Sequence, residues 1–269
     1  MGEITLISWN VNGIRAVSKK VVHNNLKFND WLYKASPDVL CLQETKAQID
    51  QLTEKIISPQ GYKSYWHSAE RKGYSGVVTY SKTNPNRVNN NLGIKKFDSE
   101  GRVVETEFDD FVLFNVYFPN GKMNKERLQY KMDFYDTFLD YVMKLRKEGK
   151  SVIICGDVNT AHTEIDLTHA KANENTSGFL KEEREWIDKL LKNGFIDTFR
   201  HFNKESENYT WWSARAIVKG VTARERNVGW RIDYFFISDD LLDNLIESKT
   251  MNEVMGSDHC PLLIKLKFK

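Results

Sequence analysis

The sequence lacks the features on which zinc-binding, disulfide-bonded and membrane-spanning proteins depend. Its 269 residues include only three cysteines and six histidines, and none of them lie at the paired spacings that zinc sites use. No apolar run approaches the ~20 residues that a membrane span requires, and the net charge is only +2. A basic surface for nucleic acid must therefore be local, because no strong overall positive field is available.

Other motifs that the sequence lacks restrict its possible reactions and its cellular compartment. No Gly-rich Walker loop is present to bind a nucleoside triphosphate, and no Gly-x-Ser-x-Gly elbow is present to carry a serine triad. The cysteines at positions 41, 155 and 260 are far apart, which favours small core residues in a reducing compartment over disulfides. The first residues show neither the charged nor the apolar region of a signal peptide, so we expect a cytoplasmic protein.

The pattern of apolar residues predicts an α/β fold. Strand-like runs occupy residues 4–9, 39–42, 62–66, 76–80, 103–108, 111–117, 152–155, 232–237 and 262–268. Apolar residues at three- and four-residue steps predict helices at about 124–148 and 181–192, with Asn124 as an N-cap and Gly149 as a stop. Helices separate several strands, which favours two mixed sheets with outer helices over an all-β sandwich. With 41% hydrophobic residues and no linker or repeat, residues 1–269 are expected to form a single domain.

Polar side chains follow four apolar segments that lie far apart in the chain. The side chains suited to metal binding or proton transfer are those of Asn10, Asn12, Glu44, Asp157, Asn159, Asp258 and His259. A buried strand does not hold an unpaired carboxylate in its middle, because that charge is costly out of water. Strand ends can hold one, and open α/β sheets bind ligands there. If these ends meet, they form an oxygen-rich pocket that suits Mg²⁺ or Mn²⁺ and phosphodiester chemistry.

Each segment also has an ordinary structural explanation when it is taken alone. Asn12 precedes a glycine and forms a common turn pair, and Glu44 at a strand end can cap the next helix. Asp157 follows a glycine, and a simple turn explains that pair almost as well. A lone histidine such as His259 is more often structural than catalytic. The functional interpretation therefore depends on the four segments together.

Seven short motifs, in this order along the chain, resemble the exonuclease III family of apurinic/apyrimidinic endonucleases. They are Ser8-Trp9-Asn10-Val11-Asn12-Gly13, Leu42-Gln43-Glu44-Thr45-Lys46, Gly73-Tyr74-Ser75-Gly76, Tyr117-Phe118-Pro119-Asn120-Gly121, Gly156-Asp157-Val158-Asn159-Thr160-Ala161-His162, Trp230-Arg231-Ile232-Asp233-Tyr234 and Gly256-Ser257-Asp258-His259-Cys260-Pro261. The Tyr-x-Pro-Asn-Gly and Trp-Arg-x-Asp-Tyr motifs separate this family from deoxyribonuclease I-like nucleases, inositol phosphatases and sphingomyelinases. The resemblance covers essentially the whole chain. It implies a deoxyribonuclease I-like, four-layer α/β sandwich in which two mixed β-sheets pack face to face with helices outside.

The resemblance also implies a metal site. Glu44 is implied as the main Mg²⁺ ligand, with Asn12 and Asp258 near the ion and Asn10 in support, and Mn²⁺ can substitute. Some family members have aspartate at the position of Asn12. The neutral amide here removes one negative charge, which disfavours tight binding of a second metal ion.

The catalytic residues are implied in the same way. Asp157 is implied as the base that activates the attacking water, with Asn159 orienting that water. Asp233 and His259 are implied to form a carboxylate–imidazole pair facing the scissile phosphate, which Tyr117 also contacts. We expect the acidic metal ligands to raise the pKa of Asp157, and Mg²⁺ and the imidazole to lower it.

Contacts with DNA are expected from loops that lie beside these motifs. The residues assigned to DNA are Arg15, Lys46, Arg71, Lys72, Tyr74, Asn120, Lys122, Asn173, Trp211, Arg215, Trp230 and Ile232. The two tryptophans and Ile232 are implied to form a pocket for a flipped sugar, with Arg215 as a wedge into the duplex. The ordinary alternatives are solvated surface lysines and core tryptophans. Residues 216–222 look like an insertion relative to the family.

These implications predict a Mg²⁺-dependent enzyme of base excision repair. It would hydrolyse the phosphodiester 5′ to an abasic site in double-stranded DNA, leaving a 3′-hydroxyl and a 5′-deoxyribose phosphate. Family members also show 3′→5′ exonuclease activity, and some archaeal relatives cut beside uracil or other altered bases. We expect a monomer that does not bind membranes. A non-DNA phosphodiesterase or phosphatase of the same superfamily, and a non-catalytic DNA-binding module, remain as alternatives.

Overall fold

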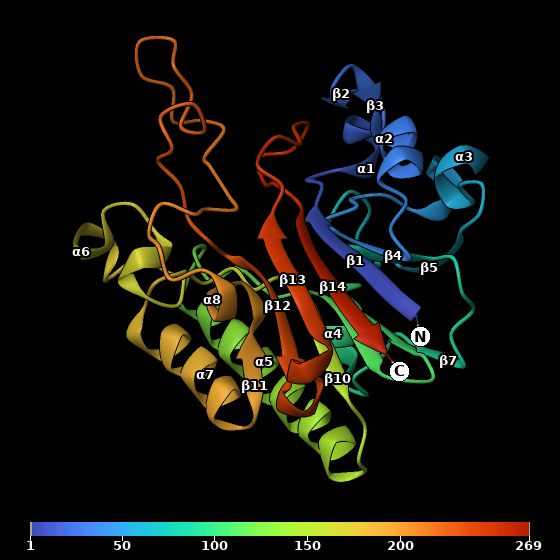
Figure 1. Ribbon diagram of the computed structural model, residues 1–269. Coiled ribbons are helices and arrows are strands. Elements are labelled where there is room, and N and C mark those ends of the chain that lie inside the picture. The colour runs from blue at the N-terminus through green and yellow to red at the C-terminus, as the bar shows by residue number, and fades with distance from the viewer. Residues whose placement is uncertain (1, 269) are drawn as a thin grey trace.

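The computed structural model describes residues 2–268 and contains two six-stranded sheets (Figure 1). The first sheet has the order β13 (Leu245–Thr250), β14 (Leu262–Phe268), β1 (Gly2–Asn10), β4 (Val39–Gln43), β6 (Val77–Ser81) and β5 (Lys63–His67). The second has the order β11 (Phe195–Asp197), β12 (Asp233–Ser238), β10 (Val152–Asp157), β9 (Val112–Tyr117), β8 (Val103–Glu107) and β7 (Arg87–Asn89). β1 runs parallel to β4, and β9 runs parallel to β10, whereas the other pairs are antiparallel. Both sheets are therefore mixed, as predicted.

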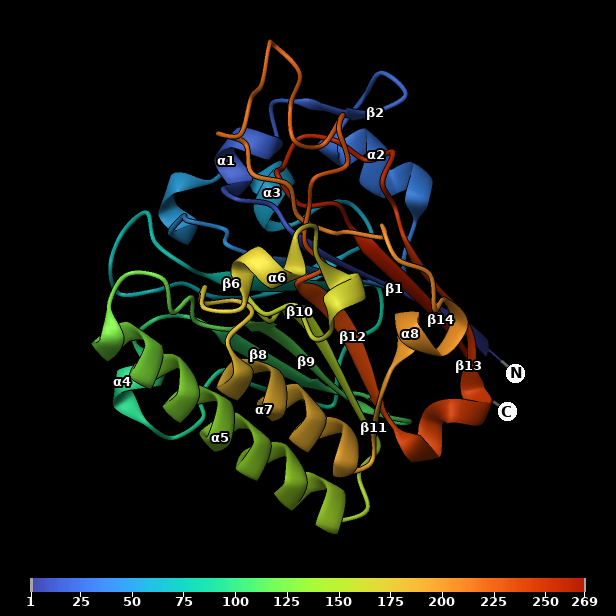
Figure 2. The ribbon, with the colours of Figure 1, turned by 90° about the vertical axis from the view of Figure 1, so that its left-hand side faces the viewer.

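Helices cover the outer faces of both sheets, which gives four layers. The helices are α1 (Ile14–Val17), α2 (Phe28–Ala35), α3 (Glu54–Ile57), α4 (Lys95–Asp98), α5 (Lys125–Lys147), α6 (Ala170–Asn173), α7 (Lys181–Lys192) and α8 (Thr198–Phe202). Apolar side chains of α2 and α3 pack on β1 and β4 of the first sheet. α5 and α7 lie side by side on the second sheet (Figure 2), with their apolar faces against β9 and β10. The predicted four-layer sandwich is confirmed.

The space between the sheets is filled by the inward-facing side chains of both. Leu6 and Cys41 from the first sheet meet Ile153 and Cys155 from the second in one buried cluster. Alternate residues of a strand point to opposite faces, so neighbouring residues of β1 pack into different layers. All three cysteines are buried free thiols, which agrees with their prediction as core residues.

The long helix α5 matches its prediction closely because its end signals are strong. The Asn124 side chain accepts a hydrogen bond from the Arg127 backbone N–H at 2.8 Å, which caps the first turn. Gly149 follows the helix with φ +81°, a backbone conformation that glycine adopts without strain. The short elements are different. β7, β11 and β13, together with the hairpin of β2 (Val21–His23) and β3 (Leu26–Lys27), were not predicted.

The strand register brings the predicted site residues to one edge of the molecule. In the first sheet Asn10 lies opposite Gln43, the residue before Glu44. In the second sheet Asp157 is paired with Tyr117 on one side and with Asp233 on the other. The carboxyl ends of both parallel pairs therefore point to the same edge, where open sheets bind ligands. Within residues 2–268, no helix has both the length and the apolar character that crossing a membrane requires.

Candidate active site

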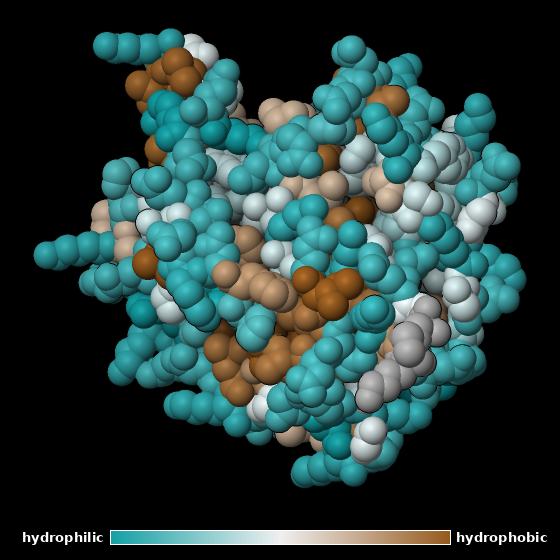
Figure 3. Space-filling model, in the orientation of Figure 1, coloured by the Kyte–Doolittle hydropathy of each residue, from teal (hydrophilic) through white to brown (hydrophobic). Residues whose placement is uncertain are grey.

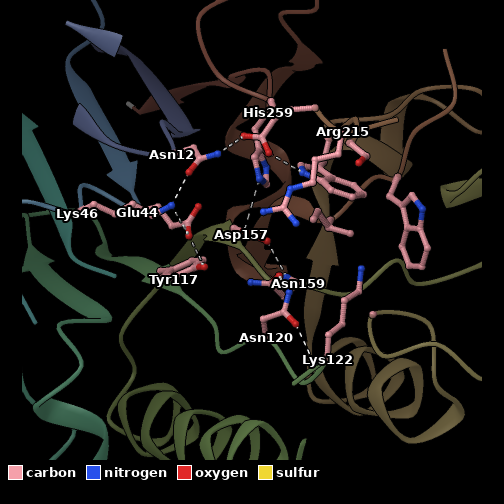
Figure 4. A pocket seen from close by; sticks show the side chains of 17 residues that line it. Asn12, Glu44, Lys46, Tyr117, Asn120, Lys122, Asp157, Asn159, Arg215 and His259 are labelled. Carbon is pink, nitrogen blue, oxygen red and sulfur yellow. Dashed lines mark hydrogen bonds and ion pairs between the residues drawn. The ribbon is translucent and has the colours of Figure 1, made fainter. Parts of the chain in front are cut away.

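A pocket of about 500 Å³ opens at this edge, between the ends of the two sheets (Figure 4). Its lining residues are Asn12, Glu44, Lys46, Tyr117, Asn120, Lys122, Asp157, Asn159, Gly178, Trp211, Ser213, Ala214, Arg215, Trp230, Ile232, Asp258 and His259. Segments separated by more than 200 residues thus meet in one cavity. One side is lined by carboxylates and amides, and the other by tryptophans and isoleucine.

Asp157 lies at the base of the pocket and is only 2% exposed. Its two oxygens accept hydrogen bonds at 2.8 Å, one from the Asn159 backbone N–H and the other from the Asn10 side-chain amide. His259 Nε2 lies 4.0 Å from Asp157 Oδ2, and His259 Nδ1 lies 2.9 Å from Asp233 Oδ2. The imidazole is therefore held between two buried carboxylates.

Burial and charge set the protonation of this group. Burial raises the pKa of Asp157 to about 7, with help from the Asp233 and Glu44 carboxylates and against the effect of His259. Burial disfavours the imidazolium of His259, but the Asp233 carboxylate outweighs it and raises the histidine pKa to about 10. The sequence analysis predicted contributions of both signs to the pKa of Asp157 and no net direction. It included neither burial nor Asp233, which are the two largest contributions.

A second polar group lies across the pocket and is centred on Glu44. The Tyr117 hydroxyl donates to Glu44 Oε1 at 2.7 Å, and the Asn12 amide donates to Asp258 Oδ1 at 2.9 Å. Lys46 Nζ lies 3.4 Å from Glu44 Oε1 and also donates to Asn12 Oδ1. The Lys46 ammonium, a cation, thus already lies between Glu44 Oε1 and Asn12 Oδ1. Carboxylate and amide oxygens around a positive charge are the donor set that Mg²⁺ and Mn²⁺ use.

Asp157, Asp233 and His259 form another group that could hold a metal ion, because one ligand atom from each lies within 4.8 Å of the others. His259 is already hydrogen-bonded to Asp233, however, and the raised pKa of His259 makes it a cation near neutral pH. A positive imidazolium repels a metal ion. The oxygen group around Glu44 is therefore the better fit.

The polypeptide around the pocket adopts backbone conformations that are unusual for residues other than glycine. Asn12, Glu44, Lys46 and Asn159 have φ values of 46°, 53°, 50° and 57°. Such conformations cost about 1–3 kcal/mol each and persist where the surrounding structure enforces them. Here the Gly13 backbone N–H donates to the Glu44 carbonyl at 2.8 Å, which ties the two loops together. Four of the twelve non-glycine residues with positive φ among residues 2–268 thus lie at the pocket.

Gly156 sets the position of Asp157 through close contact with the neighbouring strand. Its φ is +133°, and a Cβ built on it would lie 1.9 Å from the carbonyl oxygen of Val116. Glycine is therefore required at position 156 because β10 approaches β9 closely there. A side chain at this position would push β10 away from its partner.

The predicted DNA-contacting residues fall into two sets. Those that line the pocket are Lys46, Asn120, Lys122, Trp211, Arg215, Trp230 and Ile232. Those outside its lining are Arg15, Arg71, Lys72, Tyr74 and Asn173. Asn173 ends α6, and its side chain donates to the His169 carbonyl at 3.0 Å. Asn10, predicted near the metal, is also outside the lining because it is fully buried behind Asp157.

Residues 216–222 form a projecting hairpin at the rim of the pocket, visible in orange in Figure 1. Val218 and Val221 exchange two backbone hydrogen bonds of 3.0 Å around a turn at Lys219 and Gly220, both of which have positive φ. Ile217, Val218 and Val221 are exposed, and Figure 3 shows apolar surface on this projection. The hairpin therefore presents an apolar tip with a lysine to solvent.

Sequence reasoning missed a buried ion pair behind the pocket. Lys131 on α5 is fully buried and contacts Glu183 at 2.6 Å. Its ammonium also donates to the Asn159 carbonyl at 2.8 Å, while Glu183 accepts from the backbone N–H groups of Gly178 and Leu180. The pair thus fixes two loops of the pocket wall. A signal was present, because position 131 lies on the apolar stripe of the predicted helix.

Comparisons with known proteins agree with this geometry. A model of the Endonuclease/Exonuclease/phosphatase family matches residues 7–259. An exodeoxyribonuclease of Bacillus subtilis is 44% identical over 258 residues, which are 96% of this chain and 97% of that protein. A DNA-(apurinic or apyrimidinic site) endonuclease of Dictyostelium discoideum is 41% identical over 97% of this chain and 70% of its own length. The structure of an AP endonuclease from Archaeoglobus fulgidus superposes with a TM-score of 0.86 at 27% identity, covering 98% of this chain and all of that one.

Proposed function

This chain belongs to the endonuclease/exonuclease/phosphatase family, and we propose that it is a DNA-repair nuclease acting at abasic sites. In this proposal it hydrolyses the phosphodiester 5′ to an abasic sugar in double-stranded DNA. The products are a 3′-hydroxyl and a 5′-deoxyribose phosphate. The observation that carries the proposal is the pocket, which joins an acidic, proton-handling side to an aromatic side.

We propose that Glu44, Asn12 and Asp258 hold one Mg²⁺ ion, for which Mn²⁺ can substitute. The fit is supported by the Lys46 ammonium, which already occupies the space between Glu44 and Asn12. When bound, the ion would neutralise charge on the phosphate and on the leaving oxygen. Asn10 supports this group indirectly, because its side-chain oxygen accepts a hydrogen bond from the Asn12 backbone N–H at 3.0 Å.

Asp157 is proposed as the base that takes a proton from the attacking water. A pKa of about 7 leaves it ionised in part near neutral pH and makes it a stronger base than an ordinary carboxylate. The side-chain amide of Asn159 accepts from Asn120 at 2.9 Å and donates to the Phe118 carbonyl at 2.9 Å. Since an amide oxygen has two lone pairs, Asn159 can still accept a hydrogen bond from that water.

His259, Tyr117 and Asn120 are proposed to contact the reacting phosphate. His259 would donate from Nε2 while Asp233 holds its other nitrogen and stabilises the positive charge. Burial raises the pKa of Tyr117 well above its usual value, so its hydroxyl keeps its proton. This proton is donated to Glu44 here and would turn to the phosphate when Glu44 holds the metal ion. These donors would stabilise charge that develops on the phosphate oxygens.

The aromatic side of the pocket supports selection of a nucleotide that lacks its base. Trp211, Trp230 and Ile232 form the apolar wall of the pocket. An abasic nucleotide has already lost pairing and stacking, so it leaves the duplex at a lower cost than an intact one. We propose that this wall packs against the bare sugar and leaves no room for an attached base.

The surrounding loops are proposed to position the duplex through its phosphates. The residues assigned to this role are Arg15, Lys46, Arg71, Lys72, Tyr74, Lys122, Asn173 and Arg215. Phosphate contacts fix register without reading sequence, which suits an enzyme that finds damage in any context. The projecting hairpin 216–222 extends this surface beside the pocket.

The proposal also covers the finer expectations from the resemblance. The name of the B. subtilis relative, an exodeoxyribonuclease, supports exonuclease activity, and the 3′→5′ direction rests on the resemblance. Incision beside uracil or other altered bases rests on the resemblance alone, so it is included as an arm of the test. Free buried thiols fit a reducing, cytoplasmic compartment. We further propose that residues 1–269 act as one domain and as a monomer.

The test compares matched duplexes that contain a stable abasic analogue, a uracil or no damage. With Mg²⁺ we expect one cut 5′ to the abasic analogue, slower shortening from 3′ ends, and no cutting in EDTA. Glu44→Gln should bind the abasic duplex without cutting it, whereas Glu54→Gln, an exposed carboxylate on α3, should behave as wild type. An uncut abasic duplex at saturating enzyme, together with turnover of a phosphoinositide, would exclude the proposal.

A further inference from the structure

The Lys122 side chain extends into the aromatic side of the pocket (Figure 4). Its ammonium lies 5.2 Å from the ring centroid of Trp230 and 5.4 Å from that of Trp211. The start of the side chain is fixed, because the Lys122 backbone N–H donates to Asn120 Oδ1 at 2.8 Å. The amine therefore faces the same wall that the proposed function assigns to the bare sugar.

Lys122 differs from the other lysine of the pocket in its partners. Lys46 is paired with Glu44 and Asn12, whereas among residues 2–268 no carboxylate lies within ion-pair distance of Lys122. Burial beside the indole rings lowers the pKa of Lys122, although the more distant charges of Glu183 and Asp157 oppose this. The residue nevertheless remains exposed, so a substrate can reach its amine. A lysine without a counter-ion beside apolar rings is the environment that makes an amine nucleophilic.

An abasic site offers a specific partner for such an amine. Without its base, the deoxyribose exists partly as an open chain with an aldehyde at C1′. We propose that Lys122 captures this aldehyde as a reversible imine, so that the enzyme holds an abasic sugar covalently as well as by packing. This inference rests on the proposed function, because it requires an abasic sugar in the pocket.

The step balances without an oxidant or a reductant. The Lys122 nitrogen lone pair attacks C1′, and the carbonyl oxygen takes the proton that the nitrogen loses. The resulting carbinolamine then releases water as the C=N bond forms. Hydrolysis reverses the reaction, so the imine delays the release of the sugar-bearing strand without preventing it.

The test uses two duplexes that differ only in the aldehyde. One carries a natural abasic site made by removing uracil, and the other carries the tetrahydrofuran analogue, which has no aldehyde. Enzyme and duplex are mixed in EDTA, to prevent incision, and sodium cyanoborohydride is added to reduce any imine to a stable amine. We expect a covalent protein–DNA adduct with the natural site only, and peptide mass spectrometry should locate it at Lys122.

Two variants make the assignment specific. Lys122→Arg keeps the positive charge but cannot form the imine, and it should lower the adduct yield at least tenfold. Lys125→Arg removes a neighbouring exposed lysine at the start of α5 and should leave the yield unchanged. Thermal melting of both variants checks that they are folded.

The outcomes separate this inference from the proposed function. If the tetrahydrofuran duplex is cut with Mg²⁺ but no adduct forms with the natural site, the imine is wrong and the nuclease proposal stands. An adduct mapped to Lys46 or to another lysine also overturns it. If neither duplex is cut with Mg²⁺, the nuclease proposal fails, and the imine fails with it.

Discussion

Replacing Asp233 with asparagine should move both limbs of the pH–rate profile to lower pH. Asp233 Oδ2 lies 2.9 Å from His259 Nδ1 and accepts a hydrogen bond from the Thr210 hydroxyl at 2.6 Å. Asparagine keeps the size of the side chain and an acceptor oxygen but has no charge. The imidazole therefore keeps its orientation and loses the carboxylate that favours its charged form.

The size of the shift follows from the protonation of the wild-type pair. The pKa of His259 is about 10 against an ordinary 6.5, a difference of about 3.5 units, or ~5 kcal/mol at 1.36 kcal/mol per unit. Asp157 and Asp258 contribute part of this, so we expect Asp233→Asn to lower the pKa by ~2–3 units. At pH 9 about one His259 in thirty would then remain protonated, and the rate should fall by about the same factor. The lower limb should also move down, because Asp233 raises the pKa of Asp157.

The assay is single-turnover incision of a duplex with a stable abasic analogue, measured across the pH range for both enzymes with the same metal. Asp188→Asn is the matched control, because Asp188 pairs with His162 at 2.9 Å outside the pocket lining. That variant should leave the profile unchanged. The reasoning is refuted if Asp233→Asn lowers the rate equally at every pH. An NMR titration of His259 in the wild type gives an independent check, since a pKa near 6.5 there would contradict the ion pair directly.

Four further predictions concern other parts of the structure. Glu44→Gln should lower metal-dependent incision by at least ~100-fold while duplex binding by fluorescence anisotropy persists. Asp157→Asn should lower kcat by ~10²–10⁴. It should also raise the metal-free melting temperature at pH 8. Folded Asp157 holds its proton up to about pH 7, so the wild type loses stability as the pH rises from about 4 to about 7, and asparagine does not. Lys131→Met should lower the free energy of unfolding in urea by ~3–5 kcal/mol, because it leaves Glu183 buried without its partner. Deleting 217–221 should weaken duplex binding and reduce the slope of log K against log salt by about one, the contribution of one lysine.

Three of these predictions have specific controls or contrary outcomes. The Lys131→Met, Glu183→Gln double variant should be more stable than Lys131→Met alone. With Glu183→Gln measured by itself, a double loss equal to the sum of the two single losses would mean that the ion pair carries no coupling. A melting temperature of Asp157→Asn that is raised equally at pH 4 and pH 8 would show that the charge of Asp157 is not the cause. Unchanged binding after deletion of 217–221 would place the hairpin outside the duplex surface.

The central strands and the long helix were predictable because each has a clear pattern of apolar residues in the sequence. β1, β4, β9 and β10 each carry such a run that ends in a polar residue, and α5 carries an N-cap and a glycine stop as well. The edge strand β13 was not predictable in this way. Several of its residues are only half-buried, and it exists because it pairs with β14. Local pattern therefore identifies the strands that are covered on both faces, and tertiary pairing decides the rest.

For the site, the sequence allowed the residues to be identified but not their protonation. The residues that meet in the pocket could be found from polar side chains at strand ends and from the resemblance. The protonation of Asp157 could not, because burial and Asp233 dominate it and both depend on packing between distant strands. Thr210, which donates to Asp233, gave no signal because a threonine hydroxyl is common in any loop. Lys131 could have been recognised from its place on an apolar helix face.

The pairing of the last strand with the first has a consequence for synthesis of the protein. β14 lies antiparallel beside β1 along its whole length, and Asp258 and His259 immediately precede β14. Synthesis on the ribosome must therefore pass residue 259 before His259 can meet Asp157 and Asp233. Chains terminated before residue 258 would lack both β14 and the imidazole, so an incomplete translation product could not form this pocket.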